Sequence, residues 1–336
     1  MSPRHVRLDR EQRQLVAELA ALVNGRPAPA AAPNLDSARF VAQAEAQRVA
    51  GAVARTPGAV DRPGLTRLHL RDFALATQIE SRRNQAVAAA NEAGAGVLVL
   101  KGGDWAFRIY PDPGMRPMVD IDLLAAPGEA AAVVEALRSI GYRAAPGEED
   151  ALAGGYTAGL IIGEPPEVRI EVHPRLCRAT RHPIDLDGIF DRSQPLGDGA
   201  EGRRMGDVDC VVYAAVHHAL HGYRMTLLWL LDFALLAHVC GPNEEVNDRA
   251  ASWGATKALA TSRRLAESLF GPLPLPPTPQ SARSGWYLRA LLTADHLRLN
   301  RFGDDRAARV STALALMDRG RLPYLRDSLR RRMTKK

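Results

Sequence analysis

Two short strands, separated by a glycine turn and a helical segment, constrain the fold of this chain more than any other feature. Residues 97–124 read VLVLKGGDWAFRIYPDPGMRPMVDIDLL. The apolar run 97–100 predicts a strand, Lys101-Gly102-Gly103 predicts a turn, and Asp120 opens a second strand. Such a unit buries its apolar side chains against helices, so polar side chains at the strand ends are held on one rigid edge.

The second of these strands places two carboxylates on one face. Side chains two residues apart on a strand point the same way, so Asp120 and Asp122 project together. Val119, Ile121 and Leu123 then turn toward a core. Adjacent negative charges repel unless a cation joins them, and Mg²⁺ is bound by one or two carboxylates plus substrate phosphates. The pattern therefore predicts a site for a divalent metal and a nucleoside triphosphate.

A third carboxylate lies on a later strand. The run VRIEVH over 168–173 alternates, with three apolar side chains on one face and Arg169, Glu171 and His173 on the other. Three carboxylates allow two metal ions to clamp the attacking and leaving oxygens of an in-line displacement. The alternative interpretation is an exposed edge strand with alternating charges.

These motifs together resemble those of the polymerase-β-like nucleotidyltransferase superfamily. Within it, they resemble the bacterial family described only as uncharacterised nucleotidyltransferases. The matching residues are Leu100-Lys101-Gly102, Tyr110, Arg116, Asp120–Leu124, Ile170–His173, His217–His221 and Trp229–Asp232. The resemblance runs from the helix before Val97 to about Ala237.

The resemblance implies an α+β fold with an α/β-type core. A small mixed β-sheet forms the nucleotidyltransferase core, flanked by N-terminal and C-terminal helical regions. The expected division is an N-terminal helical region over 1–94, the catalytic core over 95–200, and a C-terminal helical region with a basic tail over 201–336.

The resemblance also assigns roles to the site residues. Asp120, Asp122 and Glu171 are implied as catalytic metal ligands, with Glu171 helping to activate the attacking hydroxyl. The implied nucleotide-binding residues are Lys101, Gly102, Gly103, Arg116 and His173. Many superfamily members have Gly-Ser where this chain has Gly102-Gly103, so backbone N–H groups must bind phosphate without a serine hydroxyl.

The implied reaction is metal-dependent transfer of a nucleoside monophosphate from an NTP to an acceptor, with release of pyrophosphate. Mg²⁺ or Mn²⁺ is the expected cofactor and ATP the expected donor. Two alternatives stay open. One is a non-catalytic nucleotide-binding or sensing protein built on a degenerate site, and the other is kinase-like γ-phosphoryl transfer on the same fold.

A second polar motif lies on a predicted helix and has two interpretations. His217, His221, Trp229 and Asp232 match the helical motif of the family and would then line a nucleotide or acceptor pocket. They fit a buried histidine–tryptophan–aspartate network as well. A zinc hydrolase using His217 and His221 is disfavoured, because His218 stands where the zinc-protease pattern needs glutamate.

Charge and composition indicate which class of acceptor molecule this chain can bind. Residues 301–336 hold eleven Arg or Lys against four Asp, a net charge of +7, so the rest of the chain sums to −1. Aromatic residues are 5% of the chain, too few for a base-stacking surface. A small molecule or peptide is therefore favoured as acceptor, although the basic tail also suits nucleic acid.

Three scattered cysteines and the lack of an apolar leader or span predict a cytoplasmic protein without membrane contact.

The remaining pattern is mostly helical. Helices are expected over Leu8–Asn24, Asp36–Ala54, Leu68–Ala93, Gly128–Ile140 and, in several pieces, from Cys210 to about Arg332. Tyr156–Ile162 and Val168–His173 are expected to form two strands joined by a turn. Asp185–Asp209 is expected to be loop, and Asp104 to cap the helix after the glycine turn.

Overall fold

The computed structural model describes residues 8–58, 63–147, 157–162, 168–177, 181–197, 201–223 and 225–277. The chain forms two compact units. One comprises residues 25–176 and 185–206 and holds the β-sheet, and the other comprises residues 1–24, 177–184 and 207–336. The basic segment 301–336 and the helices expected beyond 277 lie outside the described residues.

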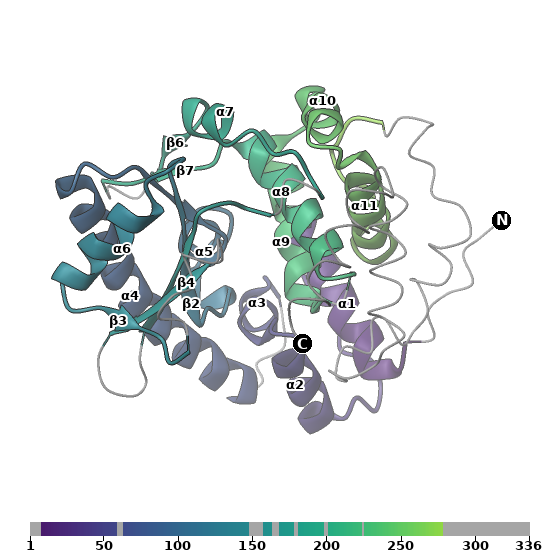
Figure 1. Cartoon of the computed structure of the whole chain (residues 1–336). Coiled ribbons are helices and arrows are strands. Elements are labelled where there is room, and N and C mark those ends of the chain that lie inside the picture. The colour runs from purple at the N-terminus through teal and green to yellow at the C-terminus, as the bar shows by residue number, and fades with distance from the viewer. Residues whose placement is uncertain are drawn as a thin grey trace, which may run out of the picture. The chain divides into compact units, whose positions relative to one another are not determined.

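The first unit is built on a seven-stranded sheet in the order β3-β4-β5-β2-β1-β7-β6 (Figure 1). Its strands are β1 (Val97–Leu100), β2 (Asp120–Ala125), β3 (Arg143–Ala144), β4 (Ala158–Ile162), β5 (Val168–His173), β6 (Gln194–Pro195) and β7 (Arg203–Arg204). β2 pairs in parallel with β5 and β1 with β7, whereas the other neighbours are antiparallel. The expected α+β fold with a mixed sheet is confirmed.

One face of this sheet is buried under two helices, α4 (Pro63–Glu92) and α6 (Ala130–Ser139) (Figure 1). Ile121 and Leu123 of β2 are fully buried there, together with Ile170 and Val172 of β5. Because strand side chains alternate, the residues between them face the opposite side of the sheet. Val119 was predicted to join this core, but it precedes β2 and is 63% exposed.

Five shorter elements complete the first unit: α2 (Ser37–Ala46), α3 (Ala50–Arg55), α5 (Gly102–Arg108), the 3₁₀ helix η1 (Pro113–Met115) and α7 (Leu186–Asp191). The single helix predicted over Asp36–Ala54 is wrong, because the chain breaks between α2 and α3. Asp36 caps α2, but Arg48 has a φ of 58°, a left-handed conformation that no continuous α-helix accommodates.

The prediction that Asp185–Asp209 is loop is also wrong. Asp185 accepts a hydrogen bond from the Gly188 amide and starts α7, and β6 and β7 follow as a short antiparallel pair. β7 then pairs with β1, a strand far away in sequence. Strands of two residues have no periodic pattern of their own, so this extension of the sheet is a product of tertiary pairing.

The second unit is helical in its described part. It contains α1 (Arg10–Val23), α8 (Asp207–Leu220), α9 (Leu227–Cys240), α10 (Glu245–Ser252) and α11 (Thr256–Phe270). α1 agrees with the predicted helix and starts with a capping box, in which Asp9 and Gln12 bond each other's backbone amides. α11 packs against both α8 and α9. No described helix has the length and hydropathy that a bilayer span requires.

Candidate active site

The candidate site lies on the face of the sheet opposite α4 and α6. β2 and β5 run parallel, with Asp122 paired to Glu171, Asp120 to Arg169 and Leu124 to His173. Arg169, Glu171 and His173 share one face of β5, as its alternating burial shows. The register therefore places the Asp120–Asp122 pair directly beside the polar face of the neighbouring strand, although about fifty residues separate them in sequence.

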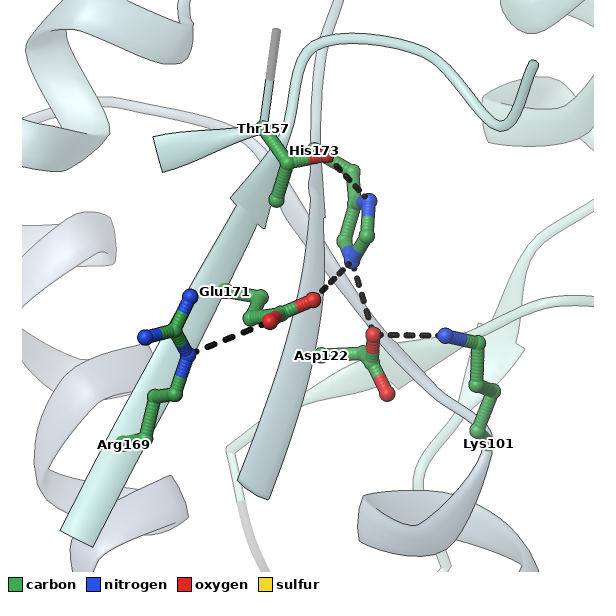
Figure 2. A network of polar contacts seen from close by, with 6 residues as sticks. All are labelled: Lys101, Asp122, Thr157, Arg169, Glu171 and His173. Atoms are coloured by element: carbon green, nitrogen blue, oxygen red, sulfur yellow. Dashed lines mark hydrogen bonds and ion pairs between the residues drawn. The ribbon is translucent and has the colours of Figure 1, made fainter. Parts of the chain in front are cut away.

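Asp122 stands at the centre of this polar network (Figure 2). One oxygen, Oδ1, accepts a hydrogen bond from Lys101 Nζ at 2.7 Å and another from His173 Nε2 at 2.7 Å. Burial alone would raise the pKa of Asp122. The Lys101 charge and the His173 contact outweigh burial and hold that pKa well below its usual range. Asp122 is therefore a buried, ionised carboxylate.

Glu171 approaches the same histidine from the other side. Its Oε2 lies 3.7 Å from His173 Nε2, and its Oε1 accepts a hydrogen bond from Arg169 Nε at 3.1 Å (Figure 2). The ligand atoms of Asp122, Glu171 and His173 all lie within 4.8 Å of one another. Among the described residues, no other group of three or more His, Cys, Asp or Glu side chains meets that spacing.

Asp120 is a second carboxylate on the same face. It has no hydrogen bond or ion pair to the described residues. Burial raises its pKa, and the negative charges of Asp122 and Glu171 raise it further, whereas Lys101 and Arg48 act in the opposite direction. A half-buried carboxylate near two others, with no hydrogen bond or ion pair among the described residues, is an arrangement that a bound cation stabilises.

The turn after β1 gives Lys101 its position. Lys101 has a φ of 44° and a ψ of −121°, a left-handed conformation that favours glycine. Its carbonyl accepts hydrogen bonds from the amides of Asp104 and Trp105. Lys101, not Asp104, is thus the residue that precedes α5. The expected capping role of Asp104 is wrong, because Arg108 engages its carboxylate one turn further along the helix.

Gly102 and Gly103 are needed for close packing. A Cβ on Gly102 would lie 2.6 Å from Arg116 Nη1, and a Cβ on Gly103 would lie 2.7 Å from Val99 Cγ1. Arg116 itself is buried, with its guanidinium 5.6 Å from the centre of the Trp105 ring. The turn and Arg116 are therefore neighbours, as the resemblance implied, and glycine is what allows the guanidinium to come so close.

A fully buried arginine on α4 supports this turn, and sequence analysis missed it. Arg83 is 0% exposed, and its Nη1 donates to the Gly103 carbonyl at 2.7 Å. Its guanidinium also lies 4.8 Å from the centre of the Phe107 ring on α5. On the long helix α4, Arg83 has no local pattern that distinguishes it from the exposed arginines.

A second missed cation is Arg48, between α2 and α3. Its Nη2 donates to the Pro117 carbonyl at 3.2 Å, just before the strand that carries Asp120. The charge of Arg48 opposes the rise in the pKa of Asp120, so a residue of the N-terminal segment acts on the site. A single arginine in a polar stretch gives no sequence signal for such a role.

The histidine motif belongs to the other unit. The rings of His217, His221 and Trp229 cluster with centroids 4.5–5.0 Å apart. His217 and Trp229 are half-buried and His221 is exposed, whereas Asp232 is buried. The next histidine, His218, is buried too and contacts the Ser262 hydroxyl and the Trp229 carbonyl. The motif thus divides into a core part and a surface cluster.

The described geometry brings most of the expected site residues together. Lys101, Asp120, Asp122, Glu171 and His173 lie on one polar face, with Gly102, Gly103 and Arg116 at its border. The donor set fits a divalent cation, because oxygens of Asp122 and Glu171 and an imidazole nitrogen of His173 converge. Nearby, Asp120 has no hydrogen bond or ion pair to the part of the chain that the structure describes.

Comparison with known protein families gives a match over most of the region that holds these residues. A sequence model of the family described as "Uncharacterised nucleotidyltransferase" matches residues 33–271, more than half of the chain. The matched segment contains every residue of the polar face and also the histidine motif. Neither the curated proteins nor the solved structures include a significant match.

Proposed function

We propose a specific reaction for this chain, which belongs to the family of uncharacterised nucleotidyltransferases. The reaction is metal-dependent transfer of a nucleoside monophosphate from an NTP to an acceptor hydroxyl, with release of pyrophosphate. Membership of the family supports nucleotidyl transfer in general. The donor, the metal and the acceptor belong to the proposal.

One observation carries the proposal. The register of β2 and β5 sets Asp122 beside Glu171, with Asp120 two residues away on the same face. Mutual repulsion is expected for these carboxylates, and after burial it is what raises the pKa of Asp120. Such a cluster costs stability in the absence of a cation, so its presence on one face of the sheet supports a metal-binding function.

In this proposal Asp120, Asp122 and Glu171 hold Mg²⁺ or Mn²⁺. When bound, the metal neutralises triphosphate oxygens and lowers the charge barrier to attack on the α-phosphorus. Glu171 also accepts the proton of the attacking hydroxyl. Its contact with Arg169 fixes the direction of its carboxylate, so the oxygen nearer His173 faces the site.

The cations at the border of this face would bind the triphosphate. Lys101 lies against Asp122 and can move to a phosphate once a metal occupies the carboxylate. Arg116 presents a guanidinium beside the Gly102 turn, and Arg48 lies near Asp120. A guanidinium can donate two parallel hydrogen bonds to phosphate oxygens, which suits the position of Arg116.

The acceptor is proposed to be a small molecule or a peptide, and ATP the donor. The polar face is built entirely from residues of the family-matched segment, and the basic residues 301–336 lie outside it. A long polyanion would therefore not be needed to complete the site.

The test is a pyrophosphate-release assay with ATP, GTP, CTP and UTP, in Mg²⁺ or Mn²⁺, with a cell extract as the source of acceptor. The Asp120→Asn/Asp122→Asn variant should lose release, because both substitutions keep side-chain size but remove metal-binding charge. Asp187→Asn, an exposed aspartate on α7, is the matched control and should behave as wild type.

The assay also separates the alternatives. ADP release in place of pyrophosphate would identify a phosphotransferase. Metal-dependent NTP binding with no release from any of the four nucleotides would favour a nucleotide-sensing protein or a specialised acceptor that the extract lacks.

A further inference from the structure

We propose that His173 is a metal ligand, alongside Asp122 and Glu171, and that the site therefore prefers a first-row transition ion such as Mn²⁺ to Mg²⁺. The inference rests on the proposed function, because it concerns the same metal site. It adds a nitrogen donor to a set of ligands that is otherwise all oxygen.

The position of one ring nitrogen carries the argument. His173 Nε2 lies 2.7 Å from Asp122 Oδ1 and 3.7 Å from Glu171 Oε2 (Figure 2). It faces both carboxylates at once and is the third member of the cluster whose ligand atoms lie within 4.8 Å of one another. A nitrogen and two carboxylate oxygens at this spacing can surround one ion.

The other ring nitrogen is held from behind. His173 Nδ1 lies 3.0 Å from the Thr157 hydroxyl (Figure 2). The pairing of Ala158 with Val172 places Thr157 beside the end of β5. Metal-binding histidines usually have their second nitrogen fixed by such a partner, which orients the ring. A hydroxyl suits this role because it can donate to Nδ1 or accept from it.

The Thr157 hydroxyl also allows the ring to change its protonated nitrogen. An ionised carboxylate only accepts hydrogen bonds, so Nε2 carries the hydrogen in the contact with Asp122. A metal ion needs the lone pair at Nε2, and the hydrogen must then be at Nδ1. The Thr157 hydroxyl can rotate to accept that hydrogen, so both states of the ring have a partner.

The chemistry of the donor set determines the choice of ion. Mg²⁺ prefers six oxygen ligands, whereas imidazole binds first-row transition ions well. Mn²⁺ accepts carboxylates and imidazole together. A site with His173 as ligand is therefore expected to bind Mn²⁺ at least tenfold more tightly than Mg²⁺.

The rival interpretation is that His173 only offsets the charge of Asp122, as Lys101 does. The two interpretations predict opposite signs. If His173 is a ligand, His173→Ala weakens Mn²⁺ binding. If it only offsets charge, the same substitution removes a competitor for the carboxylate and strengthens binding. Lys101→Met serves as the reference, because loss of that ammonium should strengthen binding under either interpretation.

The experiment is a Mn²⁺ titration of the full chain without nucleotide, followed by electron paramagnetic resonance. We expect His173→Ala to weaken binding tenfold or more, Lys101→Met to strengthen it, and His238→Ala, an exposed histidine, to leave it unchanged. Thr157→Val should weaken binding, and Thr157→Ser should restore it. Unchanged or tighter binding by His173→Ala would overturn the inference.

A spectroscopic readout on the wild-type protein removes any dependence on how the variants fold. Electron spin-echo modulation of bound Mn²⁺ should show ¹⁴N coupling, replaced by ¹⁵N coupling when histidine is isotopically labelled. Bound Mn²⁺ without nitrogen coupling would overturn the inference and leave the proposed reaction standing. Nitrogen coupling without pyrophosphate release from any NTP would keep the metal site and remove the reaction.

Discussion

At the scale of single residues, the candidate site combines strain with charge. Lys101 has a backbone conformation that costs a non-glycine residue roughly 1–3 kcal/mol, and its ammonium is in contact with the buried carboxylate of Asp122. A glycine would relieve the strain but would lack the ammonium. The lysine is therefore explained by its charge and not by its fit to the turn.

The backbone strain at Lys101 predicts that a glycine substitution there is less destabilising than an alanine substitution. Lys101→Gly and Lys101→Ala both remove the ammonium, but only glycine adopts a φ of 44° without a steric cost. We expect the glycine variant to be more stable than the alanine variant by about 1 kcal/mol, the reverse of the usual order in regular structure. Urea unfolding of the two variants measures this difference, and a more stable alanine variant would contradict the account.

Sequence could predict the carboxylates and two of the neighbouring cations, Lys101 and Arg116, but not the other two. Asp120, Asp122 and Glu171 lie on strands whose alternation assigns a face to each residue. Arg48 and Arg83 reach the site through contacts between segments distant in sequence. A contact of that kind has no periodic signal, so only the folded chain reveals it.

At the scale of elements, the parallel pairing of β2 and β5 creates the site. The two strands are adjacent in the sheet although α6, β3 and β4 lie between them in sequence. Their alternation predicted which residues share a face, and the structure confirms the face and adds the register. A shift of one residue in either strand would turn its carboxylates into the core. Burial of Ile121 and Ile170 on one face therefore determines that the carboxylates lie on the other.

The break between α2 and α3 has a functional reason in this account, because it presents Arg48 to the site. Arg48→Gln should raise KM for the NTP about tenfold, because the substitution removes roughly one charge-assisted hydrogen bond to the nucleotide. The effect on kcat should be smaller. Glutamine and arginine have a similar energetic cost in the left-handed conformation at position 48, so the stability of the variant should change little.

Steady-state kinetics of pyrophosphate release measures this effect. Arg138→Gln, which removes an arginine from α6 on the other face of the sheet, is the control and should match wild type. An unchanged KM in Arg48→Gln would show that this residue has no part in NTP binding.

The element boundaries that sequence did not predict have local explanations. The Arg48 break lacks the glycine or asparagine that usually marks a left-handed residue. β6 and β7 are two residues each and depend on β1 for a partner. Longer elements with clear periodicity, such as α1 and β5, agreed with the sequence.

At the scale of the whole molecule, the two units carry different chemistry. The sheet unit contains the polar face, and the helical unit contains a buried neutral histidine. Burial lowers the pKa of His218 to about 3, against an ordinary value of 6.5, even though the Trp229 carbonyl acts in the opposite direction. The Ser262 hydroxyl and the Trp229 carbonyl give the neutral ring two hydrogen-bond partners.

Acid should therefore destabilise the helical unit through His218. The unfolded chain binds a proton at this residue below pH 6.5, whereas the folded chain resists it down to about pH 3, so stability falls as the pH drops through that window. Between pH 7 and pH 5 the contribution of His218 to the free energy of unfolding should fall by about 2 kcal/mol.

Urea unfolding at both pH values checks this prediction by comparing wild type with His218→Gln. The pH dependence should shrink in His218→Gln and persist in His221→Gln, because His221 is exposed. An equal pH dependence in wild type and His218→Gln would contradict the assignment.

The central claim is that Asp120, Asp122 and Glu171 support transfer of the α-phosphoryl group and its nucleoside. The most direct measurement follows label from NTP radioactive at either the α- or the γ-phosphate into acceptors of a cell extract. The account predicts that α-label enters an acceptor, that γ-label does not, and that Asp122→Asn abolishes the transfer. Transfer of γ-label, or α-label transfer that survives in Asp122→Asn, would contradict it.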